Sequence, residues 1–215
     1  LGVRARIGNF ARLELTGFIM DFENQIIPVS ESSGRAGAGL VNAGASLHEG
    51  VEGAFSFDFG ALAETNHSVI FDVNATWVRA TFSADRYIGR NLATGAEGKN
   101  VNGNFLPYAP QLFLTSALSW RAPFGLDVRL LCTSVGEQFA DVLNSIEPSP
   151  DGRSGKIDAY AVFDATIQYT LAEWNATFGV SVKNIGDERY IATRRPQGIR
   201  VGLPRFITAT ATFSF

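Results

Sequence analysis

Apolar and polar residues alternate along much of this chain, most clearly at its end. Between residues 206 and 215, alternate positions fall into an apolar set and a hydroxyl-bearing set. The apolar set is Ile207, Ala209, Ala211, Phe213 and Phe215, and the hydroxyl set is Thr208, Thr210, Thr212 and Ser214. Because successive side chains of a β-strand point to opposite faces, this pattern predicts a strand with one apolar and one polar face.

Eight further segments alternate with the same period, although Ser116 interrupts the apolar row of one of them. They are residues 3–7, 12–19, 51–59, 71–77, 112–120, 127–130, 161–171 and 174–183. The sequence therefore predicts an all-β, antiparallel protein of about nine strands. Several of these strands have the ~9–11 residues that a tilted membrane strand needs.

The predicted connections between strands alternate in length. Short connections fall at residues 8–10, 122–125 and 172–173, with an intermediate one at 60–67. Long polar connections fall at 28–41, 85–103, 142–158 and 188–204. Short turns at one end of the strands and long loops at the other are typical of outer-membrane β-barrels. A soluble β-sandwich has no reason to separate its loops in this way.

Aromatic residues are concentrated near both predicted ends of the strands. Those near the short turns are Phe10, Phe57, Phe59, Trp120, Phe124, Trp174, Phe213 and Phe215. Those near the long loops are Phe22, Phe105, Tyr108, Phe139, Tyr160 and Tyr190. Two such bands favour the aromatic girdles of a membrane barrel, since a soluble core would collect rings at strand centres.

Composition narrows the class of protein further. No run approaches the ~18 apolar residues of a transmembrane helix, and the mean hydropathy of +0.06 suits strands that hide apolar residues at every second position. A pI of about 5.4 gives no electrostatic reason to expect nucleic acid as a partner. The single cysteine, Cys132, excludes an internal disulfide framework.

The strand count predicts that the barrel is incomplete. A sheet that spans a bilayer cannot leave an open edge, because each unpaired backbone group costs several kcal/mol in hydrocarbon. Bacterial single-chain barrels generally have an even number of strands, whereas about nine are counted here. The chain also opens at Leu1 without an initiator Met or a signal peptide. We therefore expect a piece of a larger barrel.

Four segments resemble the C-terminal half of TonB-dependent outer-membrane receptors. They are FIMDFENQI at residues 18–26, VNAGASLHEGVE at 41–52, VKNIGDERY at 182–190, and GLPR at 202–205 followed by the alternating tail. The resemblance spans nearly the whole chain, and its specificity lies in the joint spacing of the segments. Within the family, RRPQGIR at residues 194–200 is most similar to the ferric citrate receptor branch.

The resemblance implies a 22-strand barrel with a plug, which imports a ferric chelate such as ferric citrate or another siderophore across the bacterial outer membrane. Residues 1–215 would be the C-terminal part of its barrel domain, with the plug domain and the N-terminal barrel strands absent. The energy would come from the TonB complex through the missing N-terminal part. The terminal strand, with Phe213 and Phe215, is similar to the signal read by the outer-membrane assembly machinery, which would bind it by strand addition.

Cations in the long loops are the candidate ligand-binding residues, because a chelate of the citrate type is anionic. They are Arg86, Arg90, Arg194, Arg195 and Arg200. Each could equally be an ordinary solvated loop charge or contact a lipid head group. Asp72, Asn74, Asp164 and Gln168 should face the barrel lumen as wall polarity or as contacts of the plug.

Two other classes of function stay open at this point. A passive, porin-like channel would have the same strands without a plug, and a soluble β-sandwich or an outer-membrane hydrolase would need no energy coupling. We expect no enzyme, cofactor or metal site, because His48 and His67 lack ligands at metal-binding spacing and no acid/base pair can be assembled. The glycine-rich segment 34–39 lacks a dinucleotide fingerprint and is expected to be a flexible loop.

Overall fold

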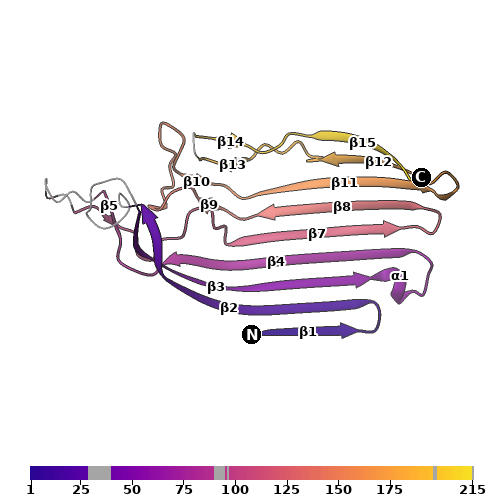
Figure 1. Cartoon of the computed structure of the whole chain (residues 1–215), viewed down its shortest axis with the longest axis horizontal. Coiled ribbons are helices and arrows are strands. Elements are labelled where there is room, and N and C mark those ends of the chain that lie inside the picture. The colour runs from indigo at the N-terminus through magenta and orange to yellow at the C-terminus, as the bar shows by residue number, and fades with distance from the viewer. Residues whose placement is uncertain (29–39, 90–94, 96, 196–197, 215) are drawn as a thin grey trace.

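The computed structural model describes residues 1–28, 40–89, 95, 97–195 and 198–214. Nine of its strands form one antiparallel sheet in chain order, as the alternation predicts. Their bounds are β1 Gly2–Ile7, β2 Ala11–Pro28, β3 Leu40–Asp58, β4 Ser68–Phe82, β7 Leu112–Arg121, β8 Leu126–Val135, β11 Tyr160–Leu171, β12 Ala176–Lys183 and β15 Phe206–Phe213. Figure 1 shows them side by side, with β1 and β15 at opposite edges. No helix among the described residues is long and apolar enough to cross a membrane.

The register brings apolar side chains into continuous rows across the sheet. One row runs through Phe57, Phe71, Leu118, Leu130, Ala165, Val182 and Ile207. The adjacent row runs through Ser56, Asp72, Ala117, Leu131 and Asp164 and lies on the opposite face. One face of the sheet is therefore apolar and suits lipid, while the other is polar and suits a water-filled or plugged lumen. The register thus confirms that Asp72, Asn74, Asp164 and Gln168 share the polar face.

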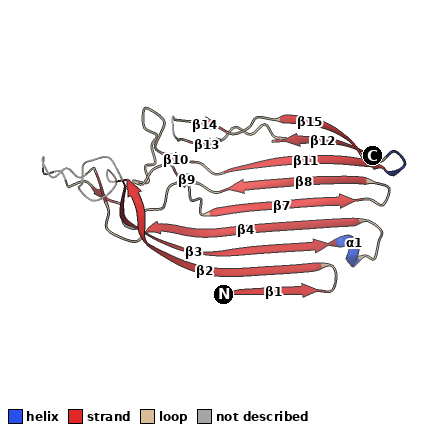
Figure 2. Ribbon diagram, in the orientation of Figure 1, coloured by secondary structure: helices blue, strands red, loops and turns tan. Residues whose placement is uncertain are grey.

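The connections separate by length as predicted, with the short ones at one end of the sheet and the long ones at the other (Figure 1). The short end includes α1, Phe59–Leu62, and the 3₁₀ helix η2, Ala172–Trp174, both visible in Figure 2. The long connections carry three small hairpins. These are β5 Tyr87–Ile88 with β6 Lys99–Asn100, β9 Gln138–Phe139 with β10 Lys156–Ile157, and β13 Ile191–Thr193 with β14 Arg200–Val201.

Several predicted strand boundaries are wrong, and β4 and β8 also extend beyond the predicted ranges 71–77 and 127–130. The strand expected from residue 174 begins at Ala176, because η2 ends at Trp174 and Asn175 adopts a left-handed conformation with φ +46° that no strand accommodates. The paired strands β2 and β3 are longer than the alternation at 12–19 and 51–59 predicts. A register shift between Phe22 and Gln25 breaks their period of two, which hides the extension from a reading of the sequence.

The aromatic band near the short turns is confirmed, but the band near the long loops does not face lipid. At the short-turn end, Phe57 lies 5.7 Å from Phe10 and 4.7 Å from Phe59 between ring centroids. At the other end, Tyr160 shares the parity of Asp164 on the polar face and stacks on Tyr190, with ring centroids 4.0 Å apart. Phe22, Phe105 and Phe139 likewise pack against His48 or each other, among polar-face and loop residues.

Candidate functional site

The loop end of the sheet is held together by Arg194, which follows β13. Its side chain is buried, with 5% of its surface exposed. Nη1 donates to the carbonyl oxygen of Gly152 at 3.4 Å, and Nη2 donates to that of Lys156 at 3.2 Å. Its backbone N–H donates to the hydroxyl of Tyr108 at 3.3 Å. Arg194 thus joins three loops that lie far apart in the sequence.

The buried guanidinium of Arg194 has no carboxylate partner among the described residues, and its Nε makes no hydrogen bond there. Burying a charge costs free energy that only hydrogen bonds and opposite charges offset, and here the carbonyl oxygens of Gly152 and Lys156 supply the hydrogen bonds. Arg194 was predicted to contact the ligand, but its guanidinium already donates hydrogen bonds to two loop carbonyl oxygens.

A polar corner fixes the base of the loop that carries Arg194. Asn184 is buried and left-handed, with φ +49°. Its Nδ2 donates to the carbonyl oxygens of Glu188 at 3.0 Å and Leu203 at 2.8 Å, while its Oδ1 accepts from the N–H of Glu188 at 2.9 Å. Asp187 accepts from the N–H of Arg205 at 2.9 Å. The first and last parts of the loop are thereby tied together directly above β12 and β15.

Arg195 is a loop cation that lies beside an open hollow. Its side chain is exposed, and its guanidinium carbon lies 5.8 Å from the centroid of the Tyr108 ring. The hollow has a volume of about 490 Å³ and is lined by Asp141, Ser149, Asp151, Arg153, Ser154 and Arg195. Cations and carboxylates are thus mixed around it. Asp141 is engaged in holding the loop, since it accepts from the N–H groups of Leu143 and Gly155.

The other three predicted cations lie in different settings. Arg86 is buried, with 6% of its surface exposed, and its guanidinium carbon lies 5.0 Å from the centroid of Phe82. Arg200 is exposed in β14. Arg90 falls outside the described residues. Tyr108 brings Arg194 and Arg195 together, because its hydroxyl accepts from the backbone N–H of Arg194 and its ring lies beside the guanidinium of Arg195. The sequence reading missed Tyr108 and Asn184 as organising residues, although Asn184 stands in the quoted segment VKNIGDERY.

Hydrogen bonds and neighbouring charges also shift the pKa values of several loop groups. Donation from the side chains of Asn100 and Asn102, each 2.9 Å from Oδ1, lowers the pKa of Asp85 below its usual value of 3.8. Donation from the Ser149 hydroxyl, and then from the N–H of Arg153, lowers the pKa of Asp151. The carboxylate of Glu137, 3.0 Å away, raises the pKa of Lys156. These pKa shifts reinforce the charged states that all three groups already have at neutral pH.

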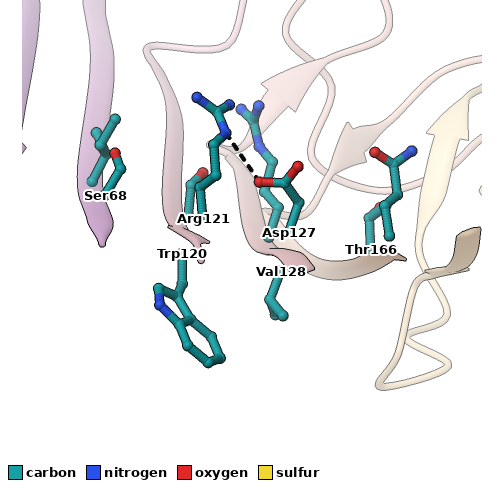
Figure 3. Close-up of a pocket in the computed structure, with 10 residues that line it drawn as sticks. Ser68, Trp120, Arg121, Asp127, Val128 and Thr166 are labelled. Atoms are coloured by element: carbon teal, nitrogen blue, oxygen red, sulfur yellow. Dashed lines mark hydrogen bonds and ion pairs between the residues drawn. The ribbon is translucent and has the colours of Figure 1, made fainter. Parts of the chain in front are cut away.

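A second hollow lies on the polar face near the short turns, and Figure 3 shows its lining. It has a volume of about 250 Å³. Arg121 Nε lies 3.0 Å from Asp127 Oδ1 across β7 and β8, and both side chains point to the same side of the sheet as Thr166. Trp120 and Val128 point to the opposite side, as their place in the apolar rows requires. This hollow is part of the lumen wall.

The histidines serve local contacts. His48 Nε2 lies 3.1 Å from the Ser46 hydroxyl, and His67 Nδ1 accepts from Trp120 Nε1 at 3.3 Å. Within the described ranges, no group of three or more His, Cys, Asp or Glu side chains is arranged to hold a metal ion.

The expected assembly signal lies at the free edge of the sheet. Phe213 ends β15, is half exposed, and packs edge-on against Phe178 with ring centroids 6.0 Å apart. Phe215 falls outside the described residues.

An antiparallel sheet with one apolar face, short turns at one end and long structured loops at the other defines the wall of an outer-membrane β-barrel. The family model described as "TonB dependent receptor-like, beta-barrel" matches residues 1–185. The chain belongs to this family and lies in the bacterial outer membrane.

Individual relatives agree with this assignment. The ferric enterobactin receptor PirA of Pseudomonas aeruginosa is 24% identical over 180 residues, which cover 81% of this chain and 21% of that protein. The unliganded ferric citrate transporter FecA superposes with a TM-score of 0.77 at 22% identity, over 98% of this chain and 29% of that one. The ferric yersiniabactin receptor FyuA of Yersinia pestis gives a TM-score of 0.72 at 20% identity, over 100% and 29%. The chain thus spans between a fifth and a third of the length of these relatives.

Proposed function

We propose that this chain is the C-terminal part of the barrel of a receptor that imports a ferric chelate, of the citrate type or another siderophore, across the outer membrane. The observation that carries the proposal is the family match over residues 1–185 together with the structured loop end. The names of the relatives, which are receptors or transporters of ferric enterobactin, ferric citrate and ferric yersiniabactin, support iron uptake as the activity.

The loop cations are proposed to contact the chelate to different degrees. Arg195 and Arg200 are exposed and free to donate to carboxylate oxygens. Arg86 and Arg194 are buried and would act by holding the loops in place. Arg90 stays a candidate from the sequence alone.

The free edges of the sheet support further strands in the same barrel. Among the described residues β1 pairs only with β2, and β15 pairs only with β12. Backbone groups along both edges need partners in hydrocarbon, because none can come from lipid. We propose that N-terminal strands of the same polypeptide complete the barrel, and that a plug domain and a TonB-contacting segment precede them.

The terminal strand is proposed to guide assembly. Phe213 lies on the lipid-facing side of an unpaired edge, where a partner strand from the assembly machinery could add by backbone hydrogen bonds and read alternate side chains. Phe215 continues the same parity in the sequence.

An uptake experiment tests the function. The full-length receptor containing this chain is expressed in cells that lack their own ferric citrate receptor, and entry of radioactive iron citrate is followed with and without a protonophore. We expect uptake that stops when the protonophore is added. The double variant Arg195→Ala, Arg200→Ala should bind the chelate more weakly, whereas Arg121→Ala, which removes another exposed cation at the opposite end of the sheet, should not.

The rival function is a passive porin-like channel. It predicts steady ion conductance of the full-length protein in planar bilayers and uptake that the protonophore leaves unchanged. That pair of results would replace the importer by the channel.

A further inference from the structure

One part of the polar face carries no charge over most of its length. Three rows cross β11, β12 and β15 between the long-loop end and the short turns. Their polar-face side chains are those of Thr166, Ser181 and Thr208, then Gln168 and Thr210, then Thr170, Thr177 and Thr212. We call these eight residues the neutral strip. Successive rows are separated by two residues, or ~7 Å along a strand, so the strip extends ~14 Å along the strands, against an apolar band ~25 Å tall in such barrels.

The side chains of the neutral strip form a continuous lining. Thr166 and Ser181 lie 2.6 Å apart between hydroxyl oxygens, and Thr170 and Thr177 lie 3.2 Å apart. In the middle row Gly179 has no side chain, and the side chains of Gln168 and Thr210 lie close to the space above it. A Cβ at that position would lie 2.8 Å from the Thr210 hydroxyl and 3.3 Å from Gln168 Cγ. Gln168, Thr208, Thr210 and Thr212 are exposed on this face.

The remaining polar face is charged on every strand. Arg4, Arg6, Arg12, Glu14, Glu52, Asp58, Asp72, Arg121, Asp127 and Arg129 all lie on the polar face of β1, β2, β3, β4, β7 or β8. On β11, β12 and β15, the described polar-face charges are Asp164 and Lys183 alone. These two side chains neutralise each other at 2.8 Å, at the long-loop end of the neutral strip.

A path for a charged solute must bind it weakly and at many successive places, because a strong site would hold it. Guanidinium groups would hold a carboxylate-bearing chelate, and acidic side chains would repel it. Hydroxyl groups can each donate one hydrogen bond and accept two, so neighbours can exchange partners with a passing solute. We propose that the neutral strip is the wall along which the hydrophilic, carboxylate- and hydroxyl-bearing iron chelate crosses the barrel.

This inference rests on the proposed import function and is tested in the full-length receptor in whole cells. Cys132 is first replaced by Ser, which leaves no thiol in this part of the chain. One cysteine is then placed by Thr208→Cys in the neutral strip, or by Ser119→Cys in the charged wall. These two positions belong to the same register row of the sheet and both lie on its polar face. Each thiol is modified with an anionic methanethiosulfonate, which forms a mixed disulfide and releases methanesulfinate.

Modification at Thr208→Cys should slow uptake of iron citrate about tenfold and leave binding at the cell surface intact, while modification at Ser119→Cys should change uptake by less than about twofold. Thr208→Ser should transport normally, which separates the charge effect from folding. Unimpaired transport after modification at Thr208→Cys would overturn the path. Equal inhibition at both positions would also overturn it, because crowding of the lumen or contact with a plug would then explain the result. If the receptor without any substitution takes up no ferric chelate, the proposed import function is wrong, and the proposed path is wrong with it.

Discussion

The guanidinium of Arg194 donates to the carbonyl oxygen of Lys156 across 3.2 Å, although 38 residues separate them in the chain. The same side chain reaches Gly152, and its own backbone reaches Tyr108. The loop between β8 and β11, which contains Gly152 and Lys156, is thereby fixed to Arg194. The loop between β4 and β7, which contains Tyr108, is fixed to the same residue. We therefore expect these three loops to move together and not independently.

Arg194→Ala tests that coupling. It removes two hydrogen bonds from a charged donor, each worth ~1.5–3 kcal/mol when buried, and leaves the carbonyls of Gly152 and Lys156 without a partner. We expect faster hydrogen exchange in residues 142–158 with little change in β7, β8 and β11. Arg195→Ala is the control, because Arg195 is exposed and makes no such bridge. Exchange that rises only within residues 188–204 would show that the loops are independent.

The corner at Asn184 gives a second prediction, with two variants that separate conformation from hydrogen bonding. Asn184→Gly keeps the left-handed backbone available but removes all three side-chain hydrogen bonds. Asn184→Asp keeps the acceptor for the N–H of Glu188 and loses both donors. We expect each to loosen residues 188–204, with Asn184→Asp the more severe by ~1–2 kcal/mol of local opening free energy, because its buried carboxylate would face the carbonyl oxygens of Glu188 and Leu203. Limited proteolysis at the loop base measures the effect, and equal cutting of both variants and the parent would contradict it.

Much of the sheet could be predicted from the sequence, because alternation fixes which face each side chain takes once a strand exists. The neutral part of the wall is readable in this way from β11 and β15, and the charged part from the alternation of the other strands. The burial of Arg194 could not be predicted from the sequence. Its burial depends on carbonyls at Gly152 and Lys156 and on Tyr108, and no local pattern relates these segments. The end of η2 was also hidden, because Trp174 continues the apolar period while Asn175 turns the chain.

The two faces of the sheet can be distinguished at neighbouring residues. Cys132 lies in an outward row with Ser116 and Phe163, and Thr133 lies in a polar-face row with Thr115 and Val162. A nitroxide attached at Cys132 in the full-length receptor should collide frequently with oxygen, which concentrates in lipid. One attached at Thr133→Cys, in a Cys132→Ser background, should collide less with oxygen. Paramagnetic resonance with oxygen and a water-soluble nickel chelate measures both, and the reverse order would exchange the lipid and lumen faces.

The loop at Asp85 should respond to acid only at low pH. Hydrogen bonds from Asn100 and Asn102 lower the pKa of Asp85 in the folded protein below the usual 3.8. A lowered carboxyl pKa means that the stabilisation is fully present above the unfolded value and is lost as the pH falls through the folded value. Hydrogen exchange around residues 99–102 should therefore be constant from neutral pH down to about 3.8, after correction for intrinsic rates, and accelerate below it. In Asp85→Asn the low-pH step should vanish, and a step at higher pH in the parent would assign the response to another group.

Gly50 and Gly53 lie on the same strand, β3, but differ in the space around them. A Cβ at Gly50 would collide with the carbonyl oxygen of Trp77 and with the Phe18 ring, which lies across this glycine. A Cβ at Gly53 would meet only Leu15 Cδ1 at 3.7 Å and the Glu14 carbonyl oxygen at 4.0 Å, which are ordinary contacts. Because the Trp77 oxygen belongs to the neighbouring backbone, Gly50→Ala must part β3 from β4 and also displace the Phe18 ring, at a cost of ~1–3 kcal/mol. Gly53→Ala should be neutral or slightly stabilising, since alanine restricts the unfolded chain. Unfolding of the full-length receptor in detergent, followed by tryptophan fluorescence in denaturant, should show a lower midpoint for Gly50→Ala alone, and equal midpoints would place the close approach of these strands in doubt.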